Sequence, residues 1–293
     1  MIIPQWIKDI PPHQPILITG PTACGKSKLA IKIAEAKGGV ITNADALQVF
    51  KNWRILTARP TNEQEKHAPH ELYGHIDGNE PYSVGRWLTE VTPIIKHTQR
   101  PIIVGGTGLY FTALTEGLAD IPNPVDEIRL ASKIKLQEHG LTSLINDLDK
   151  TTRSQIDLKN PVRVLRAWQV WSQTGHSILE WQKRTPNPIL SLNNCTPILL
   201  HREKSQLNKR IEQRVRKMLD LGVLEEIREN IPDWYKNSPS SKAIGAYQLT
   251  AHVQGKISIE EAMNLMVVAT RQFAKRQRTW FRKNMKNWRI LEL

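Results

Sequence analysis

The stretch "ILITGPTACGKSKLA", residues 16–30, decides the fold of this chain. Its apolar first part is typical of a buried strand, which we place at residues 15–19, and its last part predicts a helix over residues 26–36. The segment "GPTACGKS" between them fits the pattern GxxxxGK[ST] in the strand, loop and helix context that this pattern requires. Backbone amides of such a loop, together with the positive end of the following helix, bind phosphate groups.

The loop predicts a diphosphate site, although it does not reveal what the phosphates are attached to. We expect Lys26 to neutralise the phosphate charge and Ser27 to reach a Mg²⁺ ion. The residues expected to hold the phosphates are Gly20, Pro21, Thr22, Ala23, Cys24, Gly25, Lys26 and Ser27.

Strands and helices alternate through the first part of the chain. We expect strands at residues 39–42 and 101–104 and a helix over residues 84–96 capped by Ser83. A later apolar strand, "PILLH" at residues 197–201, would rejoin the same sheet. This order predicts an α/β fold with a P-loop NTPase-like core and a mainly parallel sheet, in which functional residues lie at the C-terminal ends of the strands.

An all-helical insertion domain is expected to interrupt this core. After the proline-broken linker "LADIPNPVDE", residues 127–182 show only helical periodicity, with candidate buried positions at Leu130, Ile134, Leu141, Leu144, Ile145 and Leu148. We therefore expect the first part of the catalytic core at residues 1–119, the insertion at 120–190 and the second part of the core at 191–293. From Lys204 onward we expect helices, apart from a loop around "KNSPSSKAIGAY", residues 236–247.

The charge of the chain predicts a polyanionic partner. The formal net charge is +13, and between Ala262 and Leu291 the sequence holds many Lys and Arg but no acidic residue. Aromatic side chains alternate with these bases and offer stacking surfaces beside phosphate-binding cations. Two cysteines exclude a disulfide framework and a four-cysteine zinc site, and the apolar runs are too short for a membrane span. Without a signal-peptide pattern at the N-terminus, we expect a cytoplasmic protein.

Four side chains are candidates for chemistry beside the loop. Asp45 follows the second predicted strand and is either a helix N-terminal acid or a base or metal contact beside the phosphates. Thr107, in "GGTGLY", brings a hydroxyl to a strand end that faces the same cleft. Arg210 and Arg214 lie one turn apart on a predicted helix, where they either grip a diphosphate or face water.

Motifs along nearly the whole chain occur in the order found in one enzyme family. Beside "GPTACGKS" they include "NADALQVF", "VGGTGLY", "NPVRVLRAWQV", "RIEQRVRKML", "KAIGAYQL" and "TRQFAKRQRTWFR". With these motifs the chain resembles the tRNA dimethylallyltransferases. The resemblance implies transfer of a dimethylallyl group from dimethylallyl diphosphate to the N6 amine of the adenosine 3′-adjacent to the anticodon, position 37, in tRNAs that read codons beginning with U.

The resemblance also implies roles for individual residues. Asp45 would accept the proton of the adenosine amine, and Thr107 would hydrogen-bond the donor near its bridging oxygen. Arg214, with Lys26 and a Mg²⁺ ion at Ser27, would stabilise the leaving diphosphate, and Arg210 would bind the donor.

The same resemblance implies that the helical insertion grips the tRNA anticodon stem-loop and that the target adenosine flips into a channel shared with the donor. The residues implied to contact tRNA are Asp45, Ala46, Leu47, Gln48, Thr107, Arg129, Arg163, Val164, Leu165, Arg166, Lys242, Ala243, Ile244, Gly245, Ala246, Tyr247, Lys275, Arg276, Gln277, Arg278, Thr279, Trp280, Phe281 and Arg282.

Two alternative functions remain open. An adenylate isopentenyltransferase of the cytokinin type would use the same loop, but its mononucleotide acceptor needs neither the helical insertion nor the basic C-terminal stretch. A P-loop small-molecule kinase would place ATP in the loop and use Asp45 as the base for a hydroxyl acceptor. Nothing in the sequence indicates an obligate dimer, and we expect a monomer.

Overall fold

The computed structural model describes residues 4–232 and 238–293, which form two compact units. The larger unit comprises Met1–Thr115 and Ile189–Leu293, and the smaller one comprises Glu116–Pro188. The sequence placed these divisions at residues 120 and 190. Of the predicted loop at residues 236–247, the first two residues lie outside the described ranges.

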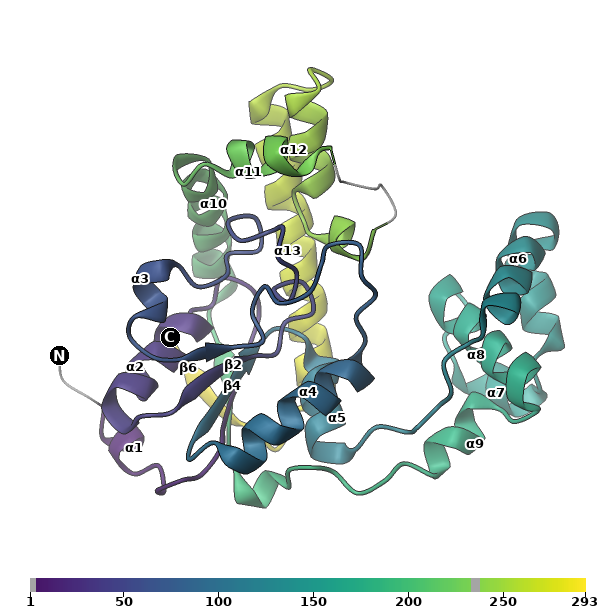
Figure 1. Ribbon diagram of the computed structural model, residues 1–293, viewed down its shortest axis with the longest axis horizontal. Helices are drawn as coiled ribbons and strands as arrows, with labels where there is room; N and C mark the ends of the chain where they lie inside the picture. Colours follow the sequence, from purple (N-terminus) through teal and green to yellow (C-terminus); the bar gives the residue numbers. More distant parts are fainter. Residues whose placement is uncertain (1–3, 233–237) are drawn as a thin grey trace. The chain divides into compact units, whose positions relative to one another are not determined.

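One parallel sheet forms the centre of the larger unit (Figure 1), with the strand order β3-β2-β4-β1-β5-β6. Every pairing between neighbouring strands is parallel, so the predicted α/β fold is confirmed. The strands are β1 (Ile16–Thr19), β2 (Val40–Asn43), β3 (His70–Glu71), β4 (Pro101–Gly105), β5 (Thr196–His201) and β6 (Arg289–Glu292).

The helices of the larger unit are α1 (Gln5–Lys8), α2 (Lys26–Lys37), α3 (Asn62–Glu65), α4 (Val84–His97), α5 (Gly108–Glu116), α10 (Lys204–Asp220), α11 (Val223–Asn230), α12 (Ala246–Val253) and α13 (Ile259–Asn284), with short 3₁₀ helices at Leu192–Asn194 and Pro239–Lys242. Some of these helices cover the sheet, whereas α11 and α12 pack against α10 and α13. Ser83 caps α4 as predicted, because its hydroxyl accepts a hydrogen bond from the backbone N–H of Arg86 at 3.1 Å. None of the helices in the described ranges has the length and apolar character needed to cross a bilayer.

Both faces of the sheet are buried, which explains the continuous apolar run of β1. Ile16 and Ile18 pack against residues of α2 and α10, whereas Leu17 packs on the other face against α4 and α5. A third cluster joins α10, α11, α12 and α13 to the loop that holds Trp53 and Leu56. This cluster places residues 53–60 beside the carboxyl edge of the sheet, where the site lies.

The prediction of helix throughout the region after Lys204 is wrong at its end. Residues Arg289–Glu292 form β6, which pairs with β5 at the sheet edge, although Ile290 is 60% exposed. The strand has four residues and lacks the alternation of buried and exposed side chains that sequence patterns require. The two-residue strand β3 also escaped prediction, for the same reason of length.

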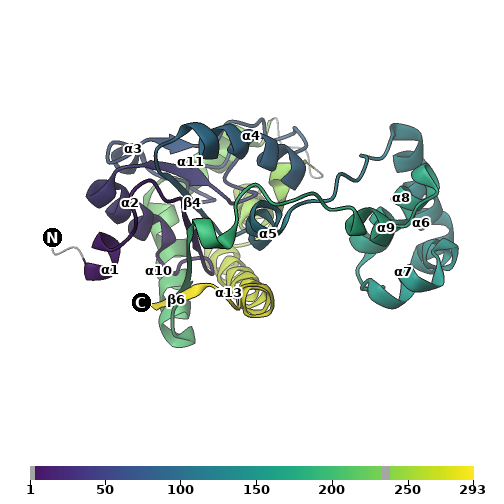
Figure 2. The ribbon, with the colours of Figure 1, turned by 90° about the horizontal axis from the view of Figure 1, so that it is seen from below.

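The smaller unit is built from four helices, α6 (Asp126–Asp147), α7 (Lys150–Gln155), α8 (Pro161–Thr174) and α9 (Ile178–Lys183), labelled in Figure 2. Its core contains Leu144, Leu148, Val164 and Ala167. Two of the positions predicted to be buried are exposed instead, Leu130 at 59% and Ile134 at 42%.

The helix α6 turns a different face toward α8 than its periodicity predicts. The buried hydroxyl of Ser132 accepts a hydrogen bond from Nε2 of Gln169 at 2.8 Å, so a polar contact occupies the interface where Leu130 and Ile134 were expected. Gly140, with φ of 72°, breaks the helix between its two halves. The break changes which positions share a face, and the apolar periodicity therefore does not run through the whole helix.

Candidate active site

The loop between β1 and α2 has the conformation of a phosphate-binding loop. Gly20 has φ of 150°, and a side-chain carbon there would lie 2.8 Å from the carbonyl oxygen of Leu200. Gly25 precedes α2 in a left-handed conformation, and no side chain in the described part of the chain caps the first amides of the helix. Nζ of Lys26 donates to the carbonyl oxygens of Gly20 and Pro21, both at 2.9 Å. The N-terminus of α2 and an ammonium group therefore meet at one place.

Side chains from two distant helices hold this loop. Oε1 of Gln277, on α13, accepts the backbone N–H of Thr22 at 2.8 Å, and its Nε2 donates to the carbonyl oxygen of Gly106 at 2.9 Å. Nε of Arg210, on α10, donates to the carbonyl oxygen of Ala23 at 2.7 Å. This bond places the guanidinium of Arg210 against the phosphate loop, and binding of a diphosphate by Arg210 stays a prediction.

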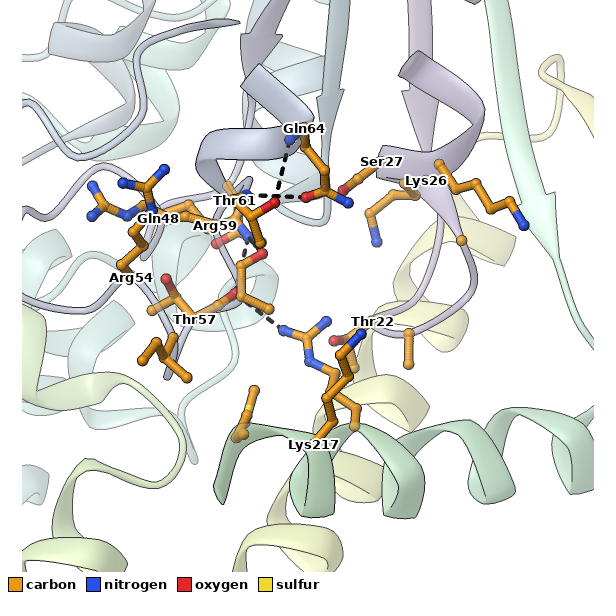
Figure 3. A pocket seen from close by; sticks show the side chains of 18 of the residues that line it. Thr22, Lys26, Ser27, Gln48, Arg54, Thr57, Arg59, Thr61, Gln64 and Lys217 are labelled. Carbon is orange, nitrogen blue, oxygen red and sulfur yellow. Dashed lines mark hydrogen bonds between the residues drawn. The ribbon is translucent and has the colours of Figure 1, made fainter. Parts of the chain in front are cut away.

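A cavity of about 650 Å³ opens beside the loop (Figure 3). Among the described residues that line it, Asp45 is the only acid. Its cationic lining residues are Lys26, Lys28, Arg54, Arg59, Arg210, Arg214 and Lys217. This excess of positive charge suits a polyanionic ligand of the size of a small diphosphate.

Asp45 lies two residues past the C-terminal end of β2. Its backbone N–H donates to Oδ1 of Asn43 at 2.9 Å, and its own Oδ1 accepts the N–H of Leu47 at 3.0 Å. Oδ2 faces Gly106, where an added side-chain carbon would lie 3.4 Å from it. Burial, followed by the charge of Asp45, raises the pKa of Tyr73, another residue of the cavity. The fixed backbone contacts leave Oδ2 as the oxygen available for chemistry.

Arg214 links the charged cavity to a smaller one. Its Nη2 donates to the carbonyl oxygen of Thr57 at 3.1 Å. Burial lowers the pKa of Arg214 and the charge of Asp45 opposes this effect; an arginine nevertheless stays protonated in proteins. A second cavity of about 70 Å³ shares Thr22, Asp45, Thr57, Arg214 and Met218 with the first, and its remaining lining is mostly apolar: Leu47, Leu56, Ile211, Val215, Ala243, Ile244, Met266, Thr270 and Phe273.

Thr107 is close to this site but lines neither cavity. Its hydroxyl oxygen accepts the N–H of Ala46 at 2.9 Å, and its own N–H donates to the carbonyl oxygen of Ala44 at 3.2 Å. Thr107 thus ties the segment that follows β4 to the segment that carries Asp45.

Several residues expected to contact tRNA have buried side chains in this structure. They are Val164, Ala243, Ala246, Gln277 and Phe281, each at most 6% exposed. They face hydrophobic cores or, for Gln277, the phosphate loop, so their side chains support a surface and do not form it.

Two further residues from the same set are engaged elsewhere. Nε2 of Gln48 donates to the carbonyl oxygens of Thr57 and Ala58, and Gln48 lines the larger cavity. Nη2 of Arg166 donates to the carbonyl oxygen of Pro122 at 3.0 Å, which fixes the linker that enters the smaller unit.

The other residues of that set, apart from Gly245, remain at least partly accessible. Exposed side chains belong to Arg129, Arg163, Lys242, Tyr247, Lys275, Arg276, Thr279 and Arg282, and half-buried ones to Asp45, Ala46, Leu47, Thr107, Leu165, Ile244, Arg278 and Trp280; Gly245 is buried. On α13, the exposed bases Lys275, Arg276 and Arg282 form what we call the basic row. The opposite side of this helix carries the buried residues Gln277 and Phe281.

Sequence reasoning missed the wall of the cavity formed by residues 53–60. Arg54, Thr57 and Arg59 line the cavity from this segment, and Tyr73 and Lys217 line it from other parts of the larger unit. Two arginines within "NWRILTARP" were a signal, but without the fold nothing connects them to the phosphate loop.

Comparison with known proteins agrees with this geometry. The IPP transferase family model matches residues 48–284, and the isopentenyl transferase model matches residues 14–71. The chain is 47% identical over 292 residues to the tRNA dimethylallyltransferase of Cereibacter sphaeroides, covering 100% of this chain and 93% of the relative. It is 51% identical over 278 residues to the protein of that name from Dinoroseobacter shibae, covering 94% and 93%.

Solved structures share the fold. The tRNA isopentenylpyrophosphate transferase of Bacillus halodurans aligns with a TM-score of 0.67 at 29% identity, covering 96% of this chain and 90% of the other. A eukaryotic dimethylallyltransferase acting on tRNA aligns with a TM-score of 0.80 at 23% identity, covering 95% and 74%. A phosphate loop, an isolated carboxylate and a match over most of the length lead to one conclusion: the chain belongs to the IPP transferase family.

Proposed function

We propose that this protein transfers the dimethylallyl group of dimethylallyl diphosphate to the N6 amine of adenosine 37, next to the anticodon of tRNAs that read codons beginning with U. One observation carries the proposal: the phosphate loop and Asp45, the single carboxylate among the described lining residues, share one cationic cavity. The curated relatives named above as tRNA dimethylallyltransferases support the choice of donor and acceptor.

The donor's diphosphate would bind to the phosphate loop at the N-terminus of α2, and the cationic side chains of the cavity would surround it. The lone pair of N6 attacks the C1 carbon of the dimethylallyl group, the C1–O bond breaks and diphosphate leaves with the bonding electrons. Lys26 and Arg214 stabilise the negative charge that develops on the leaving oxygen. Oδ2 of Asp45 takes the proton that N6 loses, and so no positive charge remains on the product nitrogen.

The apolar lining of the smaller cavity suits the hydrocarbon end of the donor or the flipped base. Asp45 and Arg214 also line this cavity, so a group bound there would lie beside the residues assigned to the reaction. Thr107 accepts a hydrogen bond from Ala46 and keeps its own hydroxyl hydrogen, which is available to donate to the donor's bridging oxygen.

A Mg²⁺ ion fits the donor set beside the loop. The cavity offers the hydroxyl of Ser27, a hard oxygen ligand, whereas the carboxylate of Asp45 serves as the proton acceptor. The described residues contain no cluster of three or more His, Cys, Asp or Glu side chains that could hold a metal, so an ion would draw most of its ligands from diphosphate and water. When bound through Ser27, it would neutralise phosphate charge.

The tRNA would contact the basic row of α13, with Lys275, Arg276 and Arg282, while the smaller unit, with Arg129 and Arg163, would grip the anticodon stem-loop. We also propose that the protein acts as a monomer in the cytoplasm, where tRNA is found.

Incubation with radiolabelled dimethylallyl diphosphate and unmodified tRNA, AMP or ATP with small alcohols tests the proposal. We expect label in tRNA, located at adenosine 37 by nuclease digestion and mass spectrometry. Label that enters AMP but not tRNA would establish the adenylate-modifying alternative. Consumption of ATP that depends on an alcohol, with no transfer of label, would establish a kinase.

A further inference from the structure

Residues 53–60 form the wall of the donor cavity that lies across from the phosphate loop. Figure 3 shows Arg54, Thr57 and Arg59 on the side of the pocket opposite Lys26. Ala58 has φ of 51°, so this segment is a tight irregular loop rather than part of a regular element. Such a backbone keeps its shape only where neighbouring groups hold it.

A single carboxylate holds the first half of this segment. Oε1 of Glu226, on α11, accepts the backbone N–H groups of Arg54 at 2.6 Å and Ile55 at 2.7 Å, and Oε2 accepts that of Leu56 at 2.8 Å. Burial raises the pKa of Glu226, while the three hydrogen bonds and Arg59 oppose that shift. Three consecutive amides directed at one carboxylate form an anion nest. Glu226 itself does not line the cavity.

The second half is held by groups of the active site. The carbonyl oxygen of Thr57 accepts hydrogen bonds from Nε2 of Gln48 at 2.9 Å and from Nη2 of Arg214 at 3.1 Å. Residues 53–60 are therefore hydrogen-bonded to Glu226 of α11 in their first half and to Gln48 and Arg214 in their second half.

The two arginines of the wall favour an anion between them and the loop. Burial and the neighbouring charge of Arg54 lower the pKa of Arg59, and Nε of Arg59 is buried without a hydrogen-bond partner among the described residues. A side-chain carbon at Gly74 would lie 1.2 Å from Nη1 of Arg59, which places this guanidinium directly over that glycine. Arg54 already forms an ion pair with Oε1 of Glu65 at 3.1 Å, and Nη2 of Arg59 donates to the carbonyl oxygen of Lys51 at 3.2 Å. An anion in the cavity would neutralise the positive charge that remains.

We propose that Glu226 is a positioning residue for the diphosphate: it fixes residues 53–60 so that Arg54 and Arg59 bind the phosphates from the side opposite the loop. The inference rests on the proposed function for the identity of the donor. Binding of the diphosphate group alone, however, can be measured without any transfer reaction.

Titration calorimetry of inorganic diphosphate with Mg²⁺ tests this role in the full-length protein. In Glu226→Gln, an NH₂ group replaces one of the two carboxylate oxygens that accept backbone N–H groups. Because NH₂ is itself a donor, at least one of these hydrogen bonds is lost. We expect the Kd for diphosphate to rise about tenfold, as for loss of one charge-assisted hydrogen bond. The KM for dimethylallyl diphosphate should rise in parallel, with kcat and the KM for tRNA within twofold of the wild type. Glu229→Gln, on the exposed side of the same helix, is the matched control and should bind normally.

A double-mutant cycle with Arg59→Ala shows whether Glu226 acts through the wall. If it does, the double variant should have about the same Kd for diphosphate as whichever of Glu226→Gln and Arg59→Ala binds it less tightly. The second change then removes an interaction that the first change has already removed. Glu226→Asp keeps the charge with a shorter side chain and should retain part of the affinity if Glu226→Gln does not fold. Additive losses in the cycle, or unchanged diphosphate affinity with only a lower Tm, would overturn the inference. Weaker diphosphate binding without any tRNA prenylation would instead support it while rejecting the proposed function.

Discussion

Oε1 of Gln277 accepts the backbone N–H of Thr22 at 2.8 Å, although the two residues lie 255 positions apart in the sequence. The helix that carries Gln277 also carries the exposed bases Lys275 and Arg276. One rigid element thus contacts the phosphate loop on one side and presents the basic row on the other. Its side-chain amide also reaches Gly106, next to Asp45, so α13 fixes the loop relative to the proposed base.

Replacement of Gln277 by Glu should weaken donor binding. The new carboxylate oxygen would face the carbonyl oxygen of Gly106 where Nε2 now donates, leaving two acceptors in contact. We expect the KM for dimethylallyl diphosphate to rise about tenfold or more, consistent with an unsatisfied buried acceptor. Gln272→Glu, an exposed position on the same helix, makes the same charge change and serves as control. A loss of tRNA affinity with unchanged donor affinity would identify Gln277 as an RNA contact instead.

Asp45→Asn should reduce turnover far more than it reduces the affinity for either substrate. Asparagine keeps the size and an acceptor for the N–H of Leu47 but cannot take a proton from the adenosine amine. Removal of a general base costs about 10²- to 10⁴-fold in kcat. Single-turnover transfer of label at saturating substrates measures this step. Transfer at the wild-type rate would remove Asp45 from the proton transfer.

Lys275→Ala should reduce the salt dependence of tRNA binding. Removal of one phosphate contact lowers the slope of log K against log salt by about 0.7 to 1. Filter binding of unmodified tRNA at several salt concentrations measures the slope. Lys8→Ala, which removes an exposed charge from α1, is the control. Equal slopes for both variants and the wild type would place the RNA path away from the basic row.

Ser27→Ala should increase the Mg²⁺ concentration needed for half-maximal transfer without changing tRNA affinity. Ser27 offers the hydroxyl that follows the loop's lysine, and alanine keeps the helix start intact. We expect a shift of about tenfold, and chelation with EDTA should abolish transfer by the wild type. An unchanged Mg²⁺ requirement would mean that the ion is held by the diphosphate without help from Ser27.

The phosphate loop and the strand that ends before Asp45 could be predicted from the sequence because their residues are close together in it. The bonds that complete the site could not. Glu226 accepts the N–H of Arg54 across 172 positions, and Gln277 reaches Gly106 across 171. Glu226 lies in a helix whose sequence resembles any charged surface helix, and only packing turns this one carboxylate toward backbone amides.

The resemblance to a known family identified regions better than it identified individual contacts. Residues 275–282 were assigned to tRNA as a block, yet the side chains of a helix point in different directions, so Lys275 is exposed whereas Gln277 and Phe281 are buried. In the smaller unit, Ser132 and Gln169 form a polar contact in the interface between α6 and α8, and Leu130 and Ile134, which were expected there, are exposed. A pattern of hydrophobic residues cannot anticipate a buried polar contact of this kind.

The stability of the larger unit should fall at acid pH through Glu90. Burial alone would raise the pKa of Glu90, but hydrogen bonds from Tyr82 at 2.6 Å, His75 at 2.8 Å and Arg86 at 2.9 Å outweigh it and hold the pKa below its ordinary value of 4.5. A lowered pKa in the folded state means that the unfolded chain binds more protons. The stabilisation is therefore complete above about pH 4.5 and is lost as the pH falls through the folded-state pKa.

Chemical denaturation between pH 3 and 7 measures this effect as the free energy of unfolding. Glu90→Gln should be less stable than the wild type at neutral pH, and the difference should shrink as the pH falls, because the wild type loses the same interactions when Glu90 takes up a proton. Glu71→Gln, an exposed position on β3, should follow the wild-type curve. A constant difference between Glu90→Gln and the wild type across this range would show that ionisation of Glu90 does not contribute to stability.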